Sequence, residues 1–210
     1  ITSYAPDLSR LLVQRALPRL PQRIALGDDV FSVRGVFVDR DFHPLGDQTS
    51  YEQLADRYLL SSQRPPARVK LHFASPTTFR SGDKNVPLPL PGLVFGGLAD
   101  RWNAHSPITV PADTRSYAEE HMAIAQCAIR TRTIDIAGGK QVGFVGSCSY
   151  LALVNDAYWQ RIIGLLAAFA FYSGVGYKTT MGFGQTFTRP VVASARASAS
   201  DYRRQGAGDK

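Results

Sequence analysis

The segment with the most potential for chemistry spans residues 173–185 and reads S-G-V-G-Y-K-T-T-M-G-F-G-Q. In this glycine loop, four glycines enclose a lysine and two threonines: Gly174, Gly176, Lys178, Thr179, Thr180, Gly182 and Gly184. Glycines permit positive φ angles and a close approach of the backbone to a ligand. Exposed amides can then face an anion, to which the lysine adds charge and the threonines add hydroxyl donors. The glycine loop therefore predicts a site for the phosphate or sugar of a nucleic acid.

Spacing excludes two familiar phosphate-binding motifs. A Walker A loop needs G-x-x-x-x-G-K-[ST] after a strand, whereas here Tyr177 separates Gly176 from Lys178 and a helix precedes them. The dinucleotide fingerprint G-x-G-x-x-G fails because Thr179 stands in place of its third glycine. The remaining alternative is a plain turn between a helix and an edge strand, which would not need the donor groups between the glycines.

The chain has four histidines, and their spacing matches no set of metal ligands: His43, His72, His105 and His121. No metal or cofactor is predicted. His43 falls in a predicted turn, and His72 lies with Lys70 on the polar face of a predicted strand. These two are the candidates for a general acid or base, against the alternative of ordinary surface histidines. His105 and His121 flank a loop and are expected to be solvated.

Four further cations are candidates for contact with RNA. Arg80 and Lys84 are expected on a loop, where they could meet backbone phosphates. Arg130 and Arg132 alternate with threonines on a predicted strand, so the two arginines share one face. With helices on the opposite face, that face would be a basic platform for RNA. The alternative for all four is ordinary solvated charge.

These residues need a scaffold, and hydrophobic patterning predicts one. The first part should contain a helix, a strand, a turn and a short helix capped by Thr49 or Ser50: 6–17, 30–38, 43–47 and 49–60. After a linker at 61–67, the order is strand, helix, strand, strand, helix, strand: 69–73, 93–105, 123–136, 143–154, 156–172 and 183–188. This β-α-β-β-α-β order is the ferredoxin-like arrangement of the α+β class.

The predicted domains are a partial N-terminal ferredoxin-like domain (1–66), a C-terminal one that carries the glycine loop (67–192) and a disordered tail (193–210). Charge follows this division. Residues 1–66 hold eight Lys/Arg and eight Asp/Glu, whereas the rest holds sixteen and nine, which accounts for the whole formal net charge of +7. A basic domain beside a neutral one suits a polyanionic partner, although a merely soluble basic surface is the alternative.

The chain begins at Ile1 with no signal-peptide pattern, and we expect it to be the later part of a longer protein. No apolar run approaches the roughly 20 residues that span a bilayer. Cys127 and Cys148 have neither metal spacing nor a disulfide framework, which fits a reducing, cytoplasmic location.

Several strings together resemble one known family. The glycine loop resembles the C-terminal glycine-rich motif of the RAMP superfamily, and especially of the sixth CRISPR-associated protein family, the endoribonucleases that process precursor CRISPR RNA. Other strings are similar to that family's C-terminal domain: 73–80 (FASPTTFR), 87–91 (PLPLP), 93–95 (LVF), 101–103 (RWN) and 143–146 (GFVG). The resemblance covers residues 68–190 well and the first part loosely.

The resemblance implies a metal-independent cut within the CRISPR repeat. An upstream 2′-hydroxyl attacks the scissile phosphate and leaves a 2′,3′-cyclic phosphate and a 5′-hydroxyl. In the family the catalytic histidine commonly lies in the first helix of the N-terminal domain, which we expect before Ile1. The implied partner is CRISPR repeat RNA, with a homodimer or an effector complex left open. The alternatives are a non-catalytic RAMP subunit that binds CRISPR RNA, and an enzyme for a small phosphorylated ligand.

Overall fold

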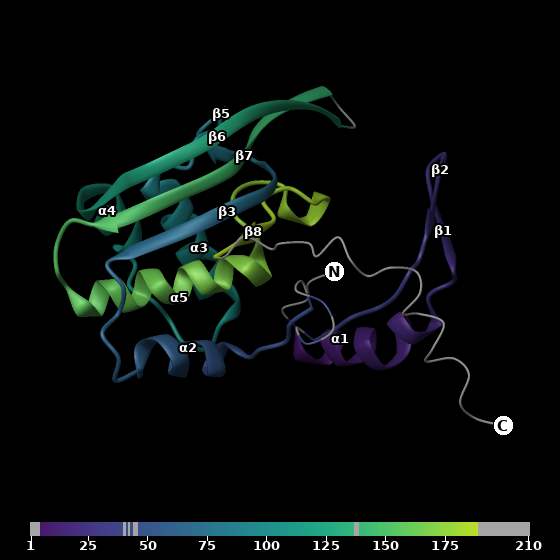
Figure 1. The fold of residues 1–210 in the computed structure, drawn as a ribbon, viewed down its shortest axis with the longest axis horizontal. Helices are drawn as coiled ribbons and strands as arrows, with labels where there is room; N and C mark the ends of the chain where they lie inside the picture. Colours follow the sequence, from purple (N-terminus) through teal and green to yellow (C-terminus); the bar gives the residue numbers. More distant parts are fainter. Residues whose placement is uncertain (1–4, 40, 42, 44–45, 137–138, 189–210) are drawn as a thin grey trace.

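A four-stranded antiparallel sheet forms the centre of the computed structural model (Figure 1), which describes residues 5–39, 41, 43, 46–136 and 139–188. Its strands run in the order β6-β7-β3-β8: Met122–Ile136, Gly139–Ala152, Arg68–Thr77 and Thr186–Phe187. The crossover helices are α3 (Pro91–His105) and α5 (Ala157–Ser173). The predicted ferredoxin-like arrangement of the later part is confirmed, because the chain order is β3-α3-β6-β7-α5-β8.

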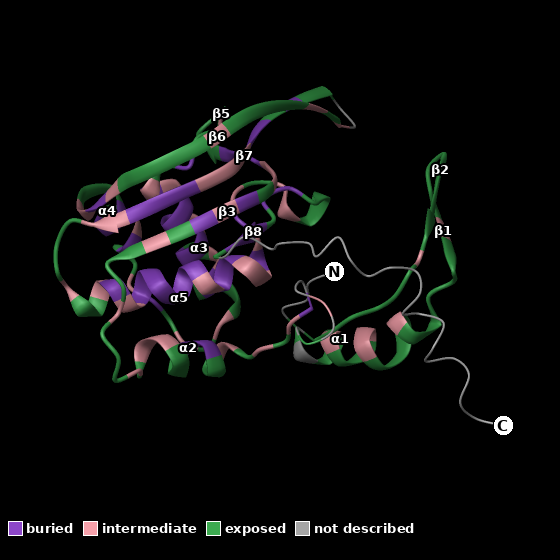
Figure 2. Cartoon of the chain, in the orientation of Figure 1, coloured by how far each residue is buried: buried purple, intermediate pink, exposed green. Residues whose placement is uncertain are grey.

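The core lies between the sheet and these helices. Leu71 and Phe73 of β3 are fully buried while His72 between them is only half-buried, as the predicted alternation required. Two large polar rings enter the core with their donors satisfied. Trp102 donates to the carbonyl of Ile108 at 2.6 Å, and Tyr150 donates to the carbonyl of Pro89 at 2.9 Å. Figure 2 shows the buried residues along β3, β7 and α5.

Several small elements were not predicted, among them strand β1 (Arg23–Leu26), which is described below. The segment expected to be a loop around Arg80 and Lys84 is a hairpin of β4 (Phe79–Ser81) and β5 (Lys84–Val86), turned at Gly82 with φ 57°. Helix α4 (Thr114–His121) lies against α3. Its start follows Asp113, a residue type that favours helix N-termini.

The predicted limits of three sheet strands were wrong. The strand predicted over 143–154 is β7, which begins at Gly139 and ends at Ala152. β3 continues through Pro76 to Thr77, with a register shift after Phe73 that accommodates the proline in the sheet. β8 contains only Thr186 and Phe187, because the preceding residues are part of the glycine loop. The β6–β7 hairpin is confirmed and extends beyond the rest of the sheet (Figure 1). Residues 137–138 between the two strands lie outside the described residues, as does the whole of the predicted tail at 193–210.

The first part begins with helix α1 (Pro6–Leu11), which continues as a π turn (Leu12–Ala16) and a 3-10 turn (Leu17–Arg19) and confirms the predicted helix. The strand predicted over 30–38 is shorter, because β1 (Arg23–Leu26) and β2 (Asp29–Ser32) form a hairpin that ends there. This region is largely exposed (Figure 2).

The short helix before the linker joins the main core. α2 (Tyr51–Leu59) begins at a capping box of Ser50 and Gln53, so Ser50 rather than Thr49 is the cap. It packs on α5, whose Arg161 donates to the carbonyl of Tyr58 at 3.3 Å. This packing crosses the domain boundary expected near residue 66, which stays a prediction. In the described part of the chain, no helix is long and apolar enough to cross a membrane.

Candidate functional site

The glycine loop is held against the end of β3 by backbone hydrogen bonds. The amide of Gly184 donates to the carbonyl of Pro76 at 3.0 Å, and that of Tyr177 donates to the carbonyl of Thr78 at 2.8 Å. Across the loop, the amide of Val175 donates to the carbonyl of Gly184 at 2.8 Å. The loop is therefore a folded element tied to the sheet and not an open turn.

Two of the glycines are required by packing. An added Cβ on Gly184 would lie 1.9 Å from the carbonyl oxygen of Val175, and one on Gly176 would lie 2.4 Å from that of Thr78. Both glycines also have positive φ angles, 72° and 87°. Gly182 has a φ of 86°, but a Cβ added to it would meet no atom within 4 Å. Gly176 and Gly184 therefore allow the close packing of the loop backbone. The close approach of a ligand that was predicted for the glycines stays a prediction.

Arg101 of α3 fixes the start of the glycine loop from the helix side. Its Nη1 donates to the carbonyls of Ser173 and Gly174 at 3.0 and 2.8 Å, and its Nη2 donates to that of Gly176 at 3.0 Å. The planar guanidinium suits several acceptors at once, which a lysine would not match. Sequence reasoning gave Arg101 no role, although it lies in the 101–103 string that resembles the family.

Lys178 is held in a strained conformation at the tip of the loop. Its φ is 61°, and it is the one non-glycine residue with a positive φ in the described part of the chain. For an L residue this conformation costs about 1–2 kcal/mol, and such strain clusters at functional sites. The next residues, Thr179–Met181, form a single 3-10 turn.

Several donors of the loop remain available to a ligand. The amides of Gly176, Lys178, Thr179 and Thr180 donate no hydrogen bond to another described residue, whereas those of Met181 and Gly182 donate within the loop. All four residues are at least partly accessible. A partly exposed amide without a protein acceptor can donate to an anion or to water. Lys178, Thr179 and Thr180 thus combine these amides with side-chain donors, and their contact with phosphate stays a prediction.

A second candidate region, the sheet cavity, opens on the sheet face away from the helices. Its volume is about 450 Å³, and it is lined by three strands: His72, Phe73, Ala74, Ala128, Ile129, Arg130, Val145 and Gly146. The register places His72 and Ala128 on either side of Ser147, and Arg130 opposite Val145. Leu71 and Phe73 face the core, so His72 faces away from it. The fold therefore brings His72 and Arg130 to one concave surface.

The sheet cavity borders on the glycine loop. Ala74 lines the cavity, and its amide donates to the carbonyl of Gln185, the last residue of the loop, at 2.8 Å. Arg132 lies two residues farther along β6, opposite Gly143, and does not line the cavity. A ligand that spans both regions would meet Arg130 and Lys178 in turn.

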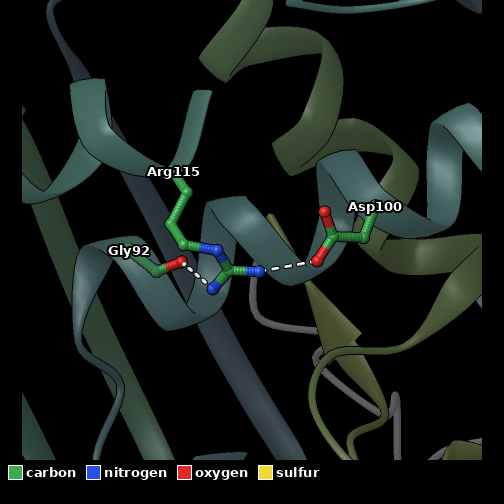
Figure 3. Close-up of polar contacts among 3 residues, drawn as sticks. All are labelled: Gly92, Asp100 and Arg115. Carbon is green, nitrogen blue, oxygen red and sulfur yellow. Dashed lines mark hydrogen bonds and ion pairs between the residues drawn. The ribbon is translucent and has the colours of Figure 1, made fainter. Parts of the chain in front are cut away.

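A third region, the arginine cleft, lies on the other side of the loop and has a volume of about 210 Å³. Its lining comes from β4, α3, α4 and the loop: Phe79, Arg80, Leu93, Gly97, Asp100, Arg101, Arg115, Gly176 and Tyr177. Figure 3 shows Arg115 joined to the carboxylate of Asp100 at 2.6 Å and to the carbonyl of Gly92 at 3.1 Å. Arg80 points toward the loop, with its guanidinium carbon 6.0 Å from the ring centre of Tyr177.

The other predicted candidates lie apart from these regions. Lys84 is exposed at the start of β5 and lines neither cavity. His43 belongs to the first part of the chain, where its ring stacks on Phe37 at 5.4 Å. Among the described residues, no group of three or more His, Cys, Asp or Glu side chains is placed to hold a metal ion.

Comparison with known proteins identifies the family. The sequence profile of the CRISPR-associated endoribonuclease Cas6 family matches residues 71–186, more than half of the chain. The chain belongs to the Cas6 family. The match begins within β3 and ends in β8, so it includes the sheet, both crossover helices and the glycine loop. The family resemblance found in the glycine loop and the 73–80 string is confirmed.

Relatives support the same assignment. The CRISPR-associated endoribonuclease Cas6 of Mycobacterium tuberculosis is 31% identical over 132 residues, which are 61% of this chain and 41% of that protein. Thermus thermophilus Cas6 is 30% identical with a TM-score of 0.67, over 75% of this chain and 65% of that one. A Cas6 product complex has a TM-score of 0.76 at 29% identity, over 89% and 74% of the two chains. The chain thus spans about two fifths of the M. tuberculosis relative.

Proposed function

We propose that this chain is the RNA-holding part of a Cas6 endoribonuclease that cuts precursor CRISPR RNA within its repeats. The observation that carries the proposal is Lys178, held at a positive φ beside donor amides that no described residue occupies. Because the loop backbone is fixed before a ligand arrives, its donors bind phosphate without a large cost in ordering. Cas6 structures similar to this chain include a product complex and a substrate-mimic complex, which supports RNA as the ligand.

In this proposal the RNA backbone runs from the sheet cavity to the glycine loop. Arg130 contacts a phosphate at the cavity, Arg132 contacts a second phosphate from the same strand face, and Lys178 contacts a third at the loop. The excess positive charge of residues 67–210 attracts the polyanion to this region. Three single-strand phosphate contacts correspond to a slope of about −2 in log affinity against log salt.

Cleavage by an upstream 2′-hydroxyl needs a group that takes its proton, a group that protonates the leaving oxygen, and a cation beside the phosphate. Within this chain, His72 is the candidate acid or base that shares a cavity with a cation, Arg130. His43 is the other candidate. The resemblance to the family instead places the catalytic histidine in a helix of the N-terminal domain, and α1 contains no histidine. The cut itself is proposed to need no metal.

The test uses the complete protein with end-labelled repeat RNA from its own CRISPR array, in buffer with EDTA. We expect one cut per repeat and 3′ ends that accept a linker only after removal of a cyclic phosphate. The variant His72→Ala reports on the cavity, and His105→Ala, an exposed histidine at the end of α3, is its matched control.

The outcomes separate the alternatives. Salt-sensitive binding without any cut would refute the nuclease and favour a non-catalytic RAMP subunit. A cut that disappears in EDTA would refute metal independence alone. If RNA binding is absent or independent of salt, both RNA functions fail, and a small phosphorylated ligand becomes the better explanation. If His72→Ala cuts as fast as His105→Ala, His72 has no catalytic role.

A further inference from the structure

The arginine cleft is a recess on the helix side of the glycine loop and lies outside the RNA path proposed above. Phe79 and Leu93 give it apolar walls, while arginines from three elements, Arg80, Arg101 and Arg115, contribute positive charge. Asp100 is the one acidic residue among the lining. A concave surface with this charge excess concentrates anions.

The three arginines differ in how far the protein already uses them. Arg101 donates to three loop carbonyls, and Arg115 is engaged by Asp100 and by the carbonyl of Gly92. Arg80 is the more available, because its Nε donates to the carbonyl of Gly82 while its Nη2 lies 3.7 Å from Asp83, in a pair whose arginine side chain is 53% exposed. Such an exposed pair is weak, so Arg80 can exchange it for a phosphate.

Tyr177 supplies an aromatic surface at the same place. Its amide is bound to the carbonyl of Thr78, which fixes its backbone, and its side chain is at the exposed end of the cleft. The guanidinium of Arg80 lies 6.0 Å from the ring centre and the ammonium of Lys178 lies 5.5 Å from it. Proteins that bind single-stranded nucleic acids stack a base on an exposed aromatic ring and hold a phosphate with a neighbouring cation, and Tyr177 with its neighbouring cations offers both on a fixed backbone.

We propose that the arginine cleft binds one nucleotide of single-stranded RNA, with its base on Tyr177 and its phosphate on Arg80. The proposal rests on the RNA-binding function proposed above and extends the RNA path to the helix side of the loop. Tyr177 and Lys178 are consecutive residues of the loop. An RNA strand whose phosphate is held at Lys178 can therefore place a neighbouring nucleotide in the cleft. The apolar walls and the stacked ring make the site tolerant of base identity.

The experiment measures binding of a labelled single-stranded oligouridine ten-mer to the complete protein over a range of salt concentrations. Tyr177→Leu should weaken binding about 5- to 150-fold, the range for loss of one stacked base, without a change in salt slope. Tyr177→Phe should bind like the wild type, because it keeps the ring. Arg80→Gln should weaken binding and make the salt slope shallower by about 0.7, the value for one single-strand phosphate.

Matched controls distinguish this site from the loop and from loss of fold. Tyr158→Leu removes a tyrosine that is 59% exposed at the opposite end of α5 and should leave binding unchanged. Lys178→Ala tests the proposed function by itself. If Lys178→Ala weakens binding but Tyr177→Leu and Arg80→Gln do not, the cleft proposal is overturned and the proposed function stands.

Other outcomes also decide. If the wild type does not bind RNA in a salt-sensitive way, the proposed function fails, and the cleft proposal fails with it. If free uridine monophosphate displaces the labelled ten-mer as well as unlabelled ten-mer does, the cleft is a site for a small nucleotide. The assignment to an RNA strand is then overturned. Loss of binding by Tyr177→Phe would also contradict stacking, since only the hydroxyl changes.

Discussion

Gly182 and Gly184 offer a direct test of the glycine loop, because both have a positive φ but their environments differ. Their φ angles are 86° and 72°, so alanine is strained at both positions. A Cβ at Gly182 meets nothing within 4 Å, whereas one at Gly184 lies 1.9 Å from the carbonyl oxygen of Val175. Comparing Gly184→Ala with Gly182→Ala therefore isolates the contribution of packing from that of conformation.

The expected losses follow from the contacts. Alanine in the left-handed region costs about 1–2 kcal/mol, which is the whole effect at Gly182. At Gly184 the loop must also open. This breaks the bonds from the Val175 amide to the Gly184 carbonyl and from the Gly184 amide to the Pro76 carbonyl. At about 1 kcal/mol net for each bond, Gly184→Ala should lose about 3–4 kcal/mol of unfolding free energy.

Urea denaturation followed by circular dichroism measures both free energies, and thermal unfolding gives a second readout. For a chain of about 200 residues, 1 kcal/mol corresponds to about 2–4 °C, so Gly184→Ala should unfold about 4–8 °C below Gly182→Ala. An equal m-value for the two variants would show that the same folded unit is measured. Unfolding midpoints within about 2 °C of each other would refute the packed geometry of the loop.

Three further predictions concern the surroundings of the loop and the core. Arg101→Lys should lower the unfolding free energy by about 2–3 kcal/mol, because a compact ammonium, although it has three donors, lacks the planar fork by which Nη1 and Nη2 reach three separate carbonyls; urea denaturation measures this, and an unchanged midpoint would contradict the role of Arg101 in holding the loop. Asp156→Ala removes the acceptor for the amides of Tyr158 and Trp159 and should cost about 1 kcal/mol, seen as a lower melting temperature. Burial raises the pKa of the Cys148 thiol from 9.0 to about 12. The unfolded chain thus loses this proton first, and stability should fall from about pH 9 to 12, less steeply in Cys148→Ala; identical alkaline slopes would argue against it.

The long elements could be predicted because their signals are local. The alternation of polar and apolar residues in β3 determines which side chains enter the core, and residue types that cap helices, Thr49 or Ser50, predict where α2 begins; α5 likewise begins at a cap, Asp156. The ferredoxin-like order followed from these elements alone. Their limits failed where tertiary contacts decide, as at Pro76, which β3 tolerates through a shift in register.

Helix α4 shows why short elements escaped prediction. It is stabilised by contact with α3 rather than by its own pattern. Gly92 and Gly96 of α3 lie at that contact: a Cβ on them would lie 2.2 Å from the Glu119 side chain and 2.6 Å from the Arg115 guanidinium, so both side chains would have to move. In the sequence, Gly96 looks like a weak point within a helix. Only the structure shows that its missing side chain leaves space for the neighbouring helix.

Part of the candidate site could likewise be suggested from the sequence, and part could not. The donors proposed for its ligand could be suggested from residue type alone, because lysine and threonine between glycines have few purely structural reasons to be there. The contacts that shape the loop could not, since Arg101 precedes it by some seventy residues in the sequence. Nothing local to Arg101 distinguishes a clamp for carbonyls from a surface arginine. Of the cations of the arginine cleft, only Arg80 was a candidate from the sequence, because the cleft is formed by residues of separate elements.

The contacts of Arg101 and Thr78 give the consecutive residues Gly176, Tyr177 and Lys178 a common mechanical role. The carbonyl of Gly176 is held by Arg101 and the amide of Tyr177 by Thr78, immediately before the strained Lys178. These bonds hold the backbone on the loop side and leave the next amides free to donate outward. A loop fixed in this way loses little conformational entropy when it binds RNA. Loosening it through Arg101→Lys should therefore weaken RNA binding while leaving the salt slope unchanged, because no phosphate contact is removed.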